Sequence, residues 1–147
     1  MSLIRKLRSF FSLAGKQQLM VVEAVLLLAV ARFLVAFFPF KAYQRTLGKV
    51  GAPLPIPNDI HLAVADEVRK NIVMAARNVP WKAVCLPQAM AGRWMLKRRG
   101  IDSVLYLGVE SRAPEKKFGG HAWLEAGSMV VTGWREMENF TVIAKFT

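Results

Sequence analysis

The feature that most limits the fold is a long apolar stretch in the first third of the chain, from Leu19 to Phe40. Its longest uncharged piece, Ala24 to Ala31, has eight residues, whereas a helix needs roughly 20 apolar residues to cross a bilayer. Glu23 and Arg32 would each cost about 2.5–3.5 kcal/mol near the centre of a membrane. No small-residue cleavage site follows a short apolar core, as a signal peptide would require. We therefore predict one long, mostly buried helix over 19–38.

A second apolar pattern precedes this stretch. Its residues recur at helical spacing with Arg5, Lys6 and Arg8 between them, which is the pattern of a helix lying on a membrane surface. The same stripe is typical of an amphipathic helix that packs on a protein core. We favour packing on the core and keep a peripheral membrane contact as the alternative. The apolar residues are Leu3, Ile4, Leu7, Phe10 and Phe11.

Helical patterns also fill the middle of the chain. A connector with three prolines over 51–57 ends the first set of helices, because proline fits neither a helix interior nor a central strand. Two further helices are predicted over 58–77 and 85–99, and Gly100 is a natural residue to end the second.

The last part of the chain has the composition of strands. A turn over 126–128, with a glycine at its centre, predicts a hairpin with a three-residue turn. Helices first and an antiparallel sheet second are the order of an α+β fold. We divide the chain into a helical N-terminal segment, residues 1–50, packed on a core formed by 51–147. The predicted strands are 103–109, 121–125, 129–132 and 141–146, and a polar loop is predicted over 111–119.

Composition and charge limit the function classes. The chain has 147 residues, of which 54% are hydrophobic, and this is enough to build a core and to exclude intrinsic disorder. One cysteine excludes an intramolecular disulfide, and with two histidines it is too little for a structural zinc site. The formal net charge of +11 predicts an acidic partner, such as a peptide, a nucleic acid or an anionic membrane face.

Cys85 and His121 are the candidates for chemistry. Cys85 opens a predicted helix, where unpaired N–H groups and the macrodipole favour a thiolate and could hold the oxyanion of an acyl-transfer intermediate. His121 follows two glycines and begins a strand, so it can approach another element and pair with the thiol. Each residue is also compatible with a structural role, because free cysteine is often buried and a core histidine can simply be hydrogen-bonded.

A third group would orient the imidazole. In the predicted hairpin Trp123 faces Val131 and His121 faces Gly133, so no acid occupies the facing position. On this reasoning Gly133→Asp would raise the rate if the site has room for the side chain. The remaining candidates for the orienting or oxyanion role are a backbone carbonyl, a water, or the side chains of Gln88, Thr132, Glu125 and Glu110.

Four short segments of the sequence together resemble a known protein family. They are Cys85-Leu86 after Pro80-Trp81, Arg98-Arg99-Gly100, Leu107-Gly108-Val109 and, above all, Gly120-His121-Ala122-Trp123-Leu124-Glu125. Together they resemble the transglutaminase-like cysteine protease of lasso-peptide maturation, in the stand-alone form whose leader-recognition domain is a separate protein. His-Ala-Trp followed by Glu is shared with the wider superfamily. Three further features favour the lasso-peptide protease over other members of that superfamily. They are the chain length, the N-terminal helices and the spacing of 36 residues from Cys85 to His121.

This resemblance implies a transglutaminase-like or papain-like cysteine protease core, with Cys85 as nucleophile and His121 as general base and acid. The family's usual third member, an Asp, falls on Gly133 here. The resemblance also implies a cytoplasmic endopeptidase, without a cofactor, that removes the leader from a ribosomally made precursor peptide. Its partners would be the leader region of that precursor, a small leader-recognition protein and an ATP-dependent macrolactam cyclase.

Three other functions stay open on the sequence. The same Cys–His pair could serve an acyl transferase or transamidase, which differs only in the acceptor of the acyl group. Gly133 in place of an acid favours a non-catalytic scaffold of a peptide-maturation complex. Nucleic-acid binding, suggested by the net charge of +11 and four tryptophans, ranks last because no known binding motif is present.

Overall fold

The computed structural model describes residues 2–56, 58–110, 120–135 and 137–147. The loop expected over 111–119 lies outside these residues. In chain order the elements are α1 (Leu3–Phe11), α2 (Gly15–Phe37), α3 (Phe40–Leu47), the 3-10 helix η1 (Asp59–His61), α4 (Leu62–Asn78), α5 (Cys85–Arg98), β1 (Val104–Glu110), β2 (Gly120–Ala126), β3 (Met129–Thr132), the 3-10 helix η2 (Met137–Asn139) and β4 (Phe140–Phe146).

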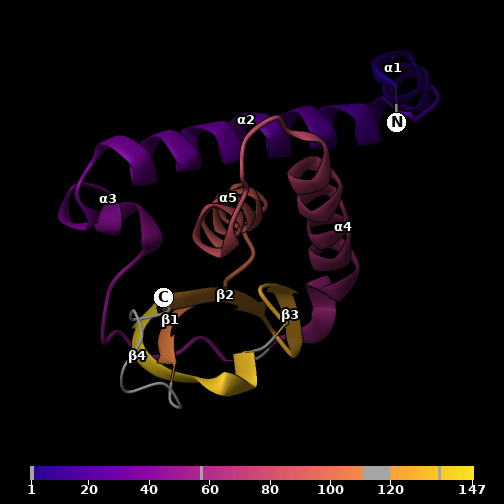
Figure 1. Ribbon diagram of the computed structural model, residues 1–147. Coiled ribbons are helices and arrows are strands. Elements are labelled where there is room, and N and C mark those ends of the chain that lie inside the picture. Colours follow the sequence, from indigo (N-terminus) through magenta and orange to yellow (C-terminus); the bar gives the residue numbers. More distant parts are fainter. Residues whose placement is uncertain (1, 57, 111–119, 136) are drawn as a thin grey trace.

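The helices and the strands form separate layers (Figure 1). The strands pair antiparallel in the order β3-β2-β1-β4. α5 lies between α2 and the sheet, and α4 packs beside it against β3 (Figure 1). This arrangement, with helices first and a small antiparallel sheet second, confirms the predicted α+β class.

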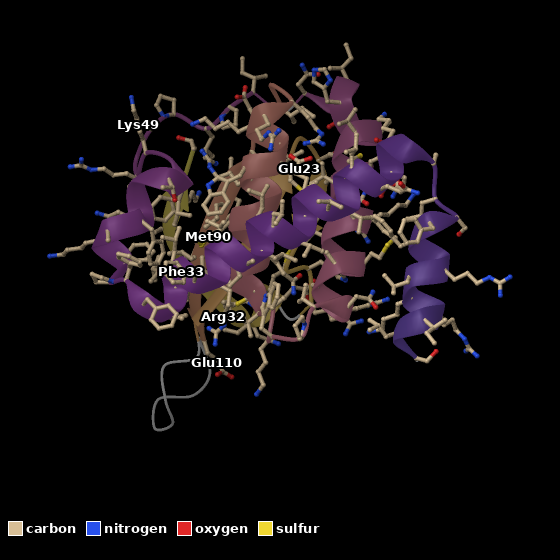
Figure 2. All side chains as sticks on the ribbon, turned by 90° about the horizontal axis from the view of Figure 1, so that it is seen from above. Glu23, Arg32, Phe33, Lys49, Met90 and Glu110 are labelled. Atoms are coloured by element: carbon tan, nitrogen blue, oxygen red, sulfur yellow. The ribbon has the colours of Figure 1, made fainter. Side chains whose placement is uncertain are left out.

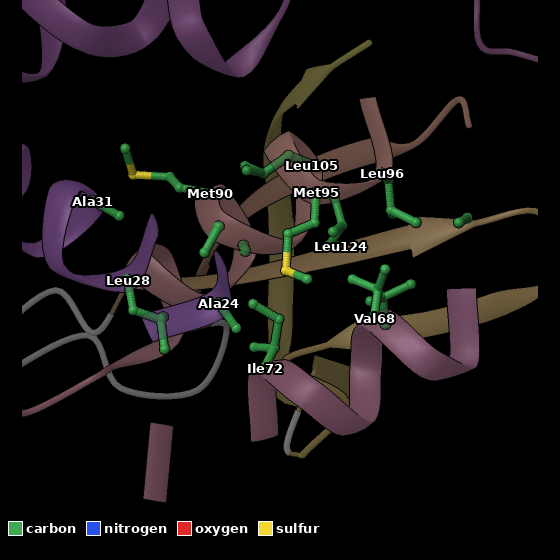
Figure 3. Packing of buried hydrophobic residues seen from close by; sticks show 14 of the residues in the cluster. Ala24, Leu28, Ala31, Val68, Ile72, Met90, Met95, Leu96, Leu105 and Leu124 are labelled. Carbon is green, nitrogen blue, oxygen red and sulfur yellow. The ribbon is translucent and has the colours of Figure 1, made fainter. Parts of the chain in front are cut away.

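α5 is the centre of the hydrophobic core, because other elements cover it on both sides. Figure 3 shows Leu28 and Ala31 of α2 beside Met90 of α5, with Ile72 of α4 close to Met95. Leu124 of β2 closes the same cluster from the sheet side. α2 therefore shares its core with residues beyond position 50, and the division of the chain at that position stays a prediction.

Glu23, one of the two charges that interrupt the apolar stretch, holds α2 to the end of α5. Arg99 donates two hydrogen bonds to its carboxylate, from Nη1 to Oε1 at 3.0 Å and from Nη2 to Oε2 at 2.7 Å. These bonds raise the pKa of Arg99 above its usual value, against the opposing effect of burial. Arg98 approaches the same carboxylate at 3.4 Å. A charge that would be costly in a lipid bilayer is thus neutralised within the protein.

The prediction that the long helix is mostly buried was wrong. α2 meets the length and composition of a membrane-crossing helix, and 22% of its most apolar window is buried. Its buried residues lie on one face, which packs on α5 and α4, and no described element covers the opposite face. The buried residues are Met20, Ala24, Leu28 and Ala31.

The preference for packing α1 on the core was also wrong. All nine residues of α1 are described, and none of them is buried. Ser2 caps the helix by accepting from the Arg5 N–H at 3.4 Å, and the Gln18 side chain bonds to backbone carbonyls at the other end. Local caps therefore define this helix, while its apolar stripe stays exposed.

The hairpin has a different register from the one predicted. Ala126 pairs with Met129, so the turn has two residues, Gly127 and Ser128, in place of three. Gly127 has a φ of +57°, which glycine adopts without a steric penalty. A bulge between Leu124 and Glu125 then shifts the pairing again. Trp123 therefore does not face Val131, and the ladder does not pair His121 with Gly133.

We predict that two leucines of α2 differ sharply in their effect on stability. Leu28→Ala, at a fully buried site, should lower the free energy of unfolding by about 2–5 kcal/mol. Leu26→Ala, two residues away and 61% exposed, should change it by less than about 1 kcal/mol. Urea denaturation of the two variants measures the difference, and equal effects would contradict the one-sided packing of α2.

Candidate active site

One pocket brings together the two residues that the sequence singles out. It has a volume of about 240 Å³ and lies where the start of α5 meets the start of β2 and the last turns of α4. Cys85 and His121 both line it. The other lining residues are Val73, Ala76, Arg77, Gln88, Gly133, Trp134 and Arg135.

Cys85 is the first residue of α5, at a helix end without a side-chain cap. Pro87 has no N–H, and the Gln88 N–H donates to the Val84 carbonyl at 3.2 Å. The N–H groups of Cys85 and Leu86 are therefore the donors directed out of this helix end, where the macrodipole favours negative charge. Since Cys85 is only partly buried, its thiol combines access with this electropositive position.

His121 is held by a backbone carbonyl and by two aromatic rings. Its Nε2 lies 2.8 Å from the carbonyl oxygen of Gly133. Because a carbonyl oxygen can only accept, Nε2 must carry the proton, and Nδ1 keeps the lone pair of the neutral imidazole. The ring stacks on Phe140 of β4 at 4.8 Å and on Trp123 at 5.9 Å between centroids. The hydrogen bond therefore fixes the tautomer and the two rings fix the orientation, an arrangement that leaves the Nδ1 lone pair able to accept a proton.

Gly133 contributes through its backbone, so the group that bonds to the imidazole is the backbone carbonyl among the candidates that the sequence left open. Its φ is +75°, a conformation that residues with a side chain rarely adopt. A Cβ at this position would collide with the Ala122 carbonyl oxygen and would lie 2.8 Å from the Cβ of Trp123. The site has no room for an aspartate, so the reasoning that Gly133→Asp could raise the rate does not hold.

Most of the chain matches a known protein family. Residues 25–145 match the family model of the Transglutaminase-like superfamily. This chain belongs to that superfamily. The matched region contains all the residues named above that line the pocket with Cys85, whereas α1 lies outside it. Neither curated proteins nor solved structures gave a significant match.

The remaining candidates occupy different places in this transglutaminase-like domain. Gln88 lines the pocket, and its side-chain amide donates to the Ala83 carbonyl at 2.5 Å, which supports the turn before Cys85. Thr132 is fully buried and does not line the pocket. Its Oγ1 has no hydrogen-bond partner among the described residues.

The two acidic candidates also lie outside the pocket lining. Glu125 accepts a hydrogen bond from Trp123 Nε1 at 3.2 Å and lines a separate pocket with Asp102 and Tyr106. Glu110 ends β1 opposite Phe140 and does not line the pocket with Cys85. Of the groups considered for the histidine, the structure therefore brings the Gly133 carbonyl to the ring.

The sequence reasoning missed the two arginines that give the pocket its positive charge, and a tryptophan beside them. Arg77 lies in the last turn of α4, and Trp134 and Arg135 follow the hairpin. Arg69 places its guanidinium 4.6 Å from the centre of the Trp134 ring, a cation–π contact that holds this indole at the pocket. None of the described residues that line the pocket is acidic. The signal in the sequence was weak, because each arginine also suits a solvated surface.

We predict that Gly133→Ala lowers the reactivity of the Cys85 thiol, which lines the same pocket as His121. A Cβ would displace the carbonyl that holds Nε2 of His121, so the imidazole would lose its fixed orientation in the pocket. Because Cys85 is the only cysteine of the chain, its alkylation by iodoacetamide at pH 6 reports this directly, and we expect a decrease in rate of about tenfold.

A matched control separates this effect from backbone strain. Gly51 has a φ of +74°, and a Cβ added there would meet no other atom within 4 Å, so Gly51→Ala carries similar strain without a collision. It should leave the alkylation rate unchanged. An unchanged rate in Gly133→Ala, or equal decreases in both variants, would contradict the role given to the Gly133 carbonyl.

Proposed function

We propose that this protein is a cysteine endopeptidase that removes the leader from a ribosomally made precursor peptide. The observation that carries the proposal is the shared pocket of Cys85, at the start of α5, and His121, whose Nε2 is held by Gly133. The superfamily membership supports it, because cysteine proteases and transamidases both belong to that superfamily.

The geometry suggests a division of roles within the pocket. Proton exchange requires Nδ1 of His121 within roughly 3–4 Å of the Cys85 sulfur. The thiolate attacks the scissile carbonyl carbon, and the N–H groups at the start of α5 stabilise the oxyanion. His121 then protonates the leaving amine, the C–N bond breaks, and a thioester to Cys85 remains. Water, deprotonated by Nδ1, hydrolyses this thioester and restores the thiol.

The choice of a lasso-peptide precursor rests on the resemblance and on charge. The segment from Gly120 to Glu125 lies in β2, which places His121 at the pocket. Arg77 and Arg135 make the pocket suitable for an acidic peptide. Under this proposal a small recognition protein delivers the leader in the cytoplasm, because tethering raises the effective concentration of the cleavage site. A macrolactam cyclase that uses ATP then acts on the released core peptide.

A transamidase is the second candidate, favoured by the same pocket and the same superfamily. It would pass the acyl group from Cys85 to an amine in place of water, and the residues of the pocket serve both reactions. The argument for a non-catalytic scaffold is weaker than the sequence implied, because it depended on the missing acid at position 133. The carbonyl of Gly133 supplies an acceptor for the imidazole there.

We predict that Cys85→Ala, Cys85→Ser and His121→Ala each abolish cleavage of the precursor. His61→Ala is the matched control, because His61 lies at the start of α4 and outside the pocket with Cys85. The assay is intact-mass analysis of the precursor after incubation with the enzyme and the recognition protein. Normal cleavage by Cys85→Ala would exclude the peptidase, and an amine adduct in place of the free leader acid would identify the transamidase.

The arginines of the pocket yield a separate prediction. Replacing both Arg77 and Arg135 by glutamine should raise KM for an acidic precursor by about five- to tenfold, because exposed charges of this kind contribute up to about 1 kcal/mol each. kcat should change less, since neither side chain is assigned to the reacting atoms. Lys41→Gln, on the exposed surface of α3, is the control. A KM that does not respond to the double substitution or to salt would contradict the charge argument.

A further inference from the structure

An uncovered apolar face runs the length of α2. Six of its large hydrophobic residues recur every three or four positions, so they lie along one side of the helix. At 1.5 Å per residue this stripe is about 27 Å long. Figure 2 looks onto this side of the molecule, where Phe33 is labelled. The six residues are Leu19, Val22, Leu26, Val30, Phe33 and Phe37, with Phe37 the most exposed at 73%.

α1 lies next to the start of α2 and away from the sheet (Figure 1), and its apolar side chains are exposed as well. Leu3, Ile4, Leu7 and Phe11 are all among its exposed hydrophobic residues. Its other residues include Arg5, Lys6 and Arg8, and it contains no acid. An exposed helix with one apolar face and a basic remainder has the composition of a helix that lies in a membrane interface.

The charged residues of the N-terminal segment, residues 1–50, are almost all positive. Residues 1–50 contain eight Lys and Arg and a single acid, Glu23, which give a net charge of +7. The Glu23 carboxylate is already bonded to Arg99. A second copy of this chain would present the same positive charge, and so like-charge repulsion opposes a dimer through this face. A surface that combines apolar contact with negative charge is the complementary occupant.

We propose that the α1–α2 face, defined as the exposed apolar residues of these two helices, docks on an anionic lipid bilayer. α2 lies flat in this arrangement, because its opposite face is buried against α4 and α5 between Met20 and Ala31 and Glu23 is bonded to Arg99. Basic residues beside the lipid surface add attraction to anionic headgroups. None of the described residues that line the pocket with Cys85 comes from α1 or α2, so docking leaves that pocket accessible.

Vesicle flotation of the full chain tests this proposal. We expect binding to vesicles of 70% phosphatidylcholine and 30% phosphatidylglycerol that is at least about tenfold tighter than binding to pure phosphatidylcholine. Binding should weaken as salt rises from 0.05 to about 0.5 M. A sodium carbonate wash should release the protein, because a peripheral helix does not cross the bilayer. Absence of binding, equal binding to both vesicles, or retention after the wash would each overturn the proposal.

Substitutions on the face give the matched comparison. Leu26→Gln combined with Phe37→Gln should weaken vesicle binding by about tenfold and leave folding intact, because both side chains are exposed. Ile143→Gln, at a 63% exposed position of β4, is the control and should leave binding unchanged. Equal loss in both variants would overturn the proposal. So would a stable dimer of the wild-type chain in sedimentation equilibrium that the double substitution dissociates, since a second copy would then be the occupant.

Discussion

The close approach of α5 to the sheet is the constraint on which the rest of the structure depends. Gly92 lies in the middle of this helix, and a Cβ there would come within 2.9 Å of the Leu124 side chain. Its neighbour Arg93 is buried and donates from Nη1 to the carbonyls of Ser103, at 2.8 Å, and Phe146, at 3.2 Å. Burial lowers the pKa of Arg93, and Asp102 opposes that shift. Two carbonyl acceptors compensate this buried cation, and they fix the helix against the ends of β1 and β4.

The site follows from this placement. With α5 fixed, its first residue, Cys85, is held where β2 begins, and His121 enters the same pocket from the sheet. A neutral carbonyl orients the imidazole in place of a carboxylate. Such an acceptor fixes the tautomer equally well but stabilises the imidazolium less, because it carries no full negative charge. The stacked rings of Phe140 and Trp123 supply the rigidity that a single hydrogen bond lacks.

The sequence could predict the parts of this structure that depend on local signals. Cys85 and Gly100 bracket a helix, and an apolar segment after Gly120 makes a strand, so the two candidate residues could be identified from their surroundings. The register of the hairpin could not be predicted, because neither the two-residue turn nor the bulge at Leu124 has a distinctive sequence pattern. The stacking of Arg69 on Trp134 joins positions 65 residues apart, and single-sequence patterns carry no information on such contacts.

The amphipathic helices show the same limit in another way. The sequence pattern indicates that α2 has apolar residues on every side, but it does not predict how many helices and strands pack against them. The answer depends on topology: α4 and α5 occupy one side, and the sheet lies beyond α5. The net charge of +11 is divided accordingly, with +7 within residues 1–50 and the pocket arginines elsewhere. The positive charge of the chain is therefore found on two surfaces, the α1–α2 face and the pocket with Cys85, and these surfaces differ in chemistry. The apolar face carries positive charge beside exposed Leu and Phe, whereas the pocket carries it beside a thiol and an imidazole.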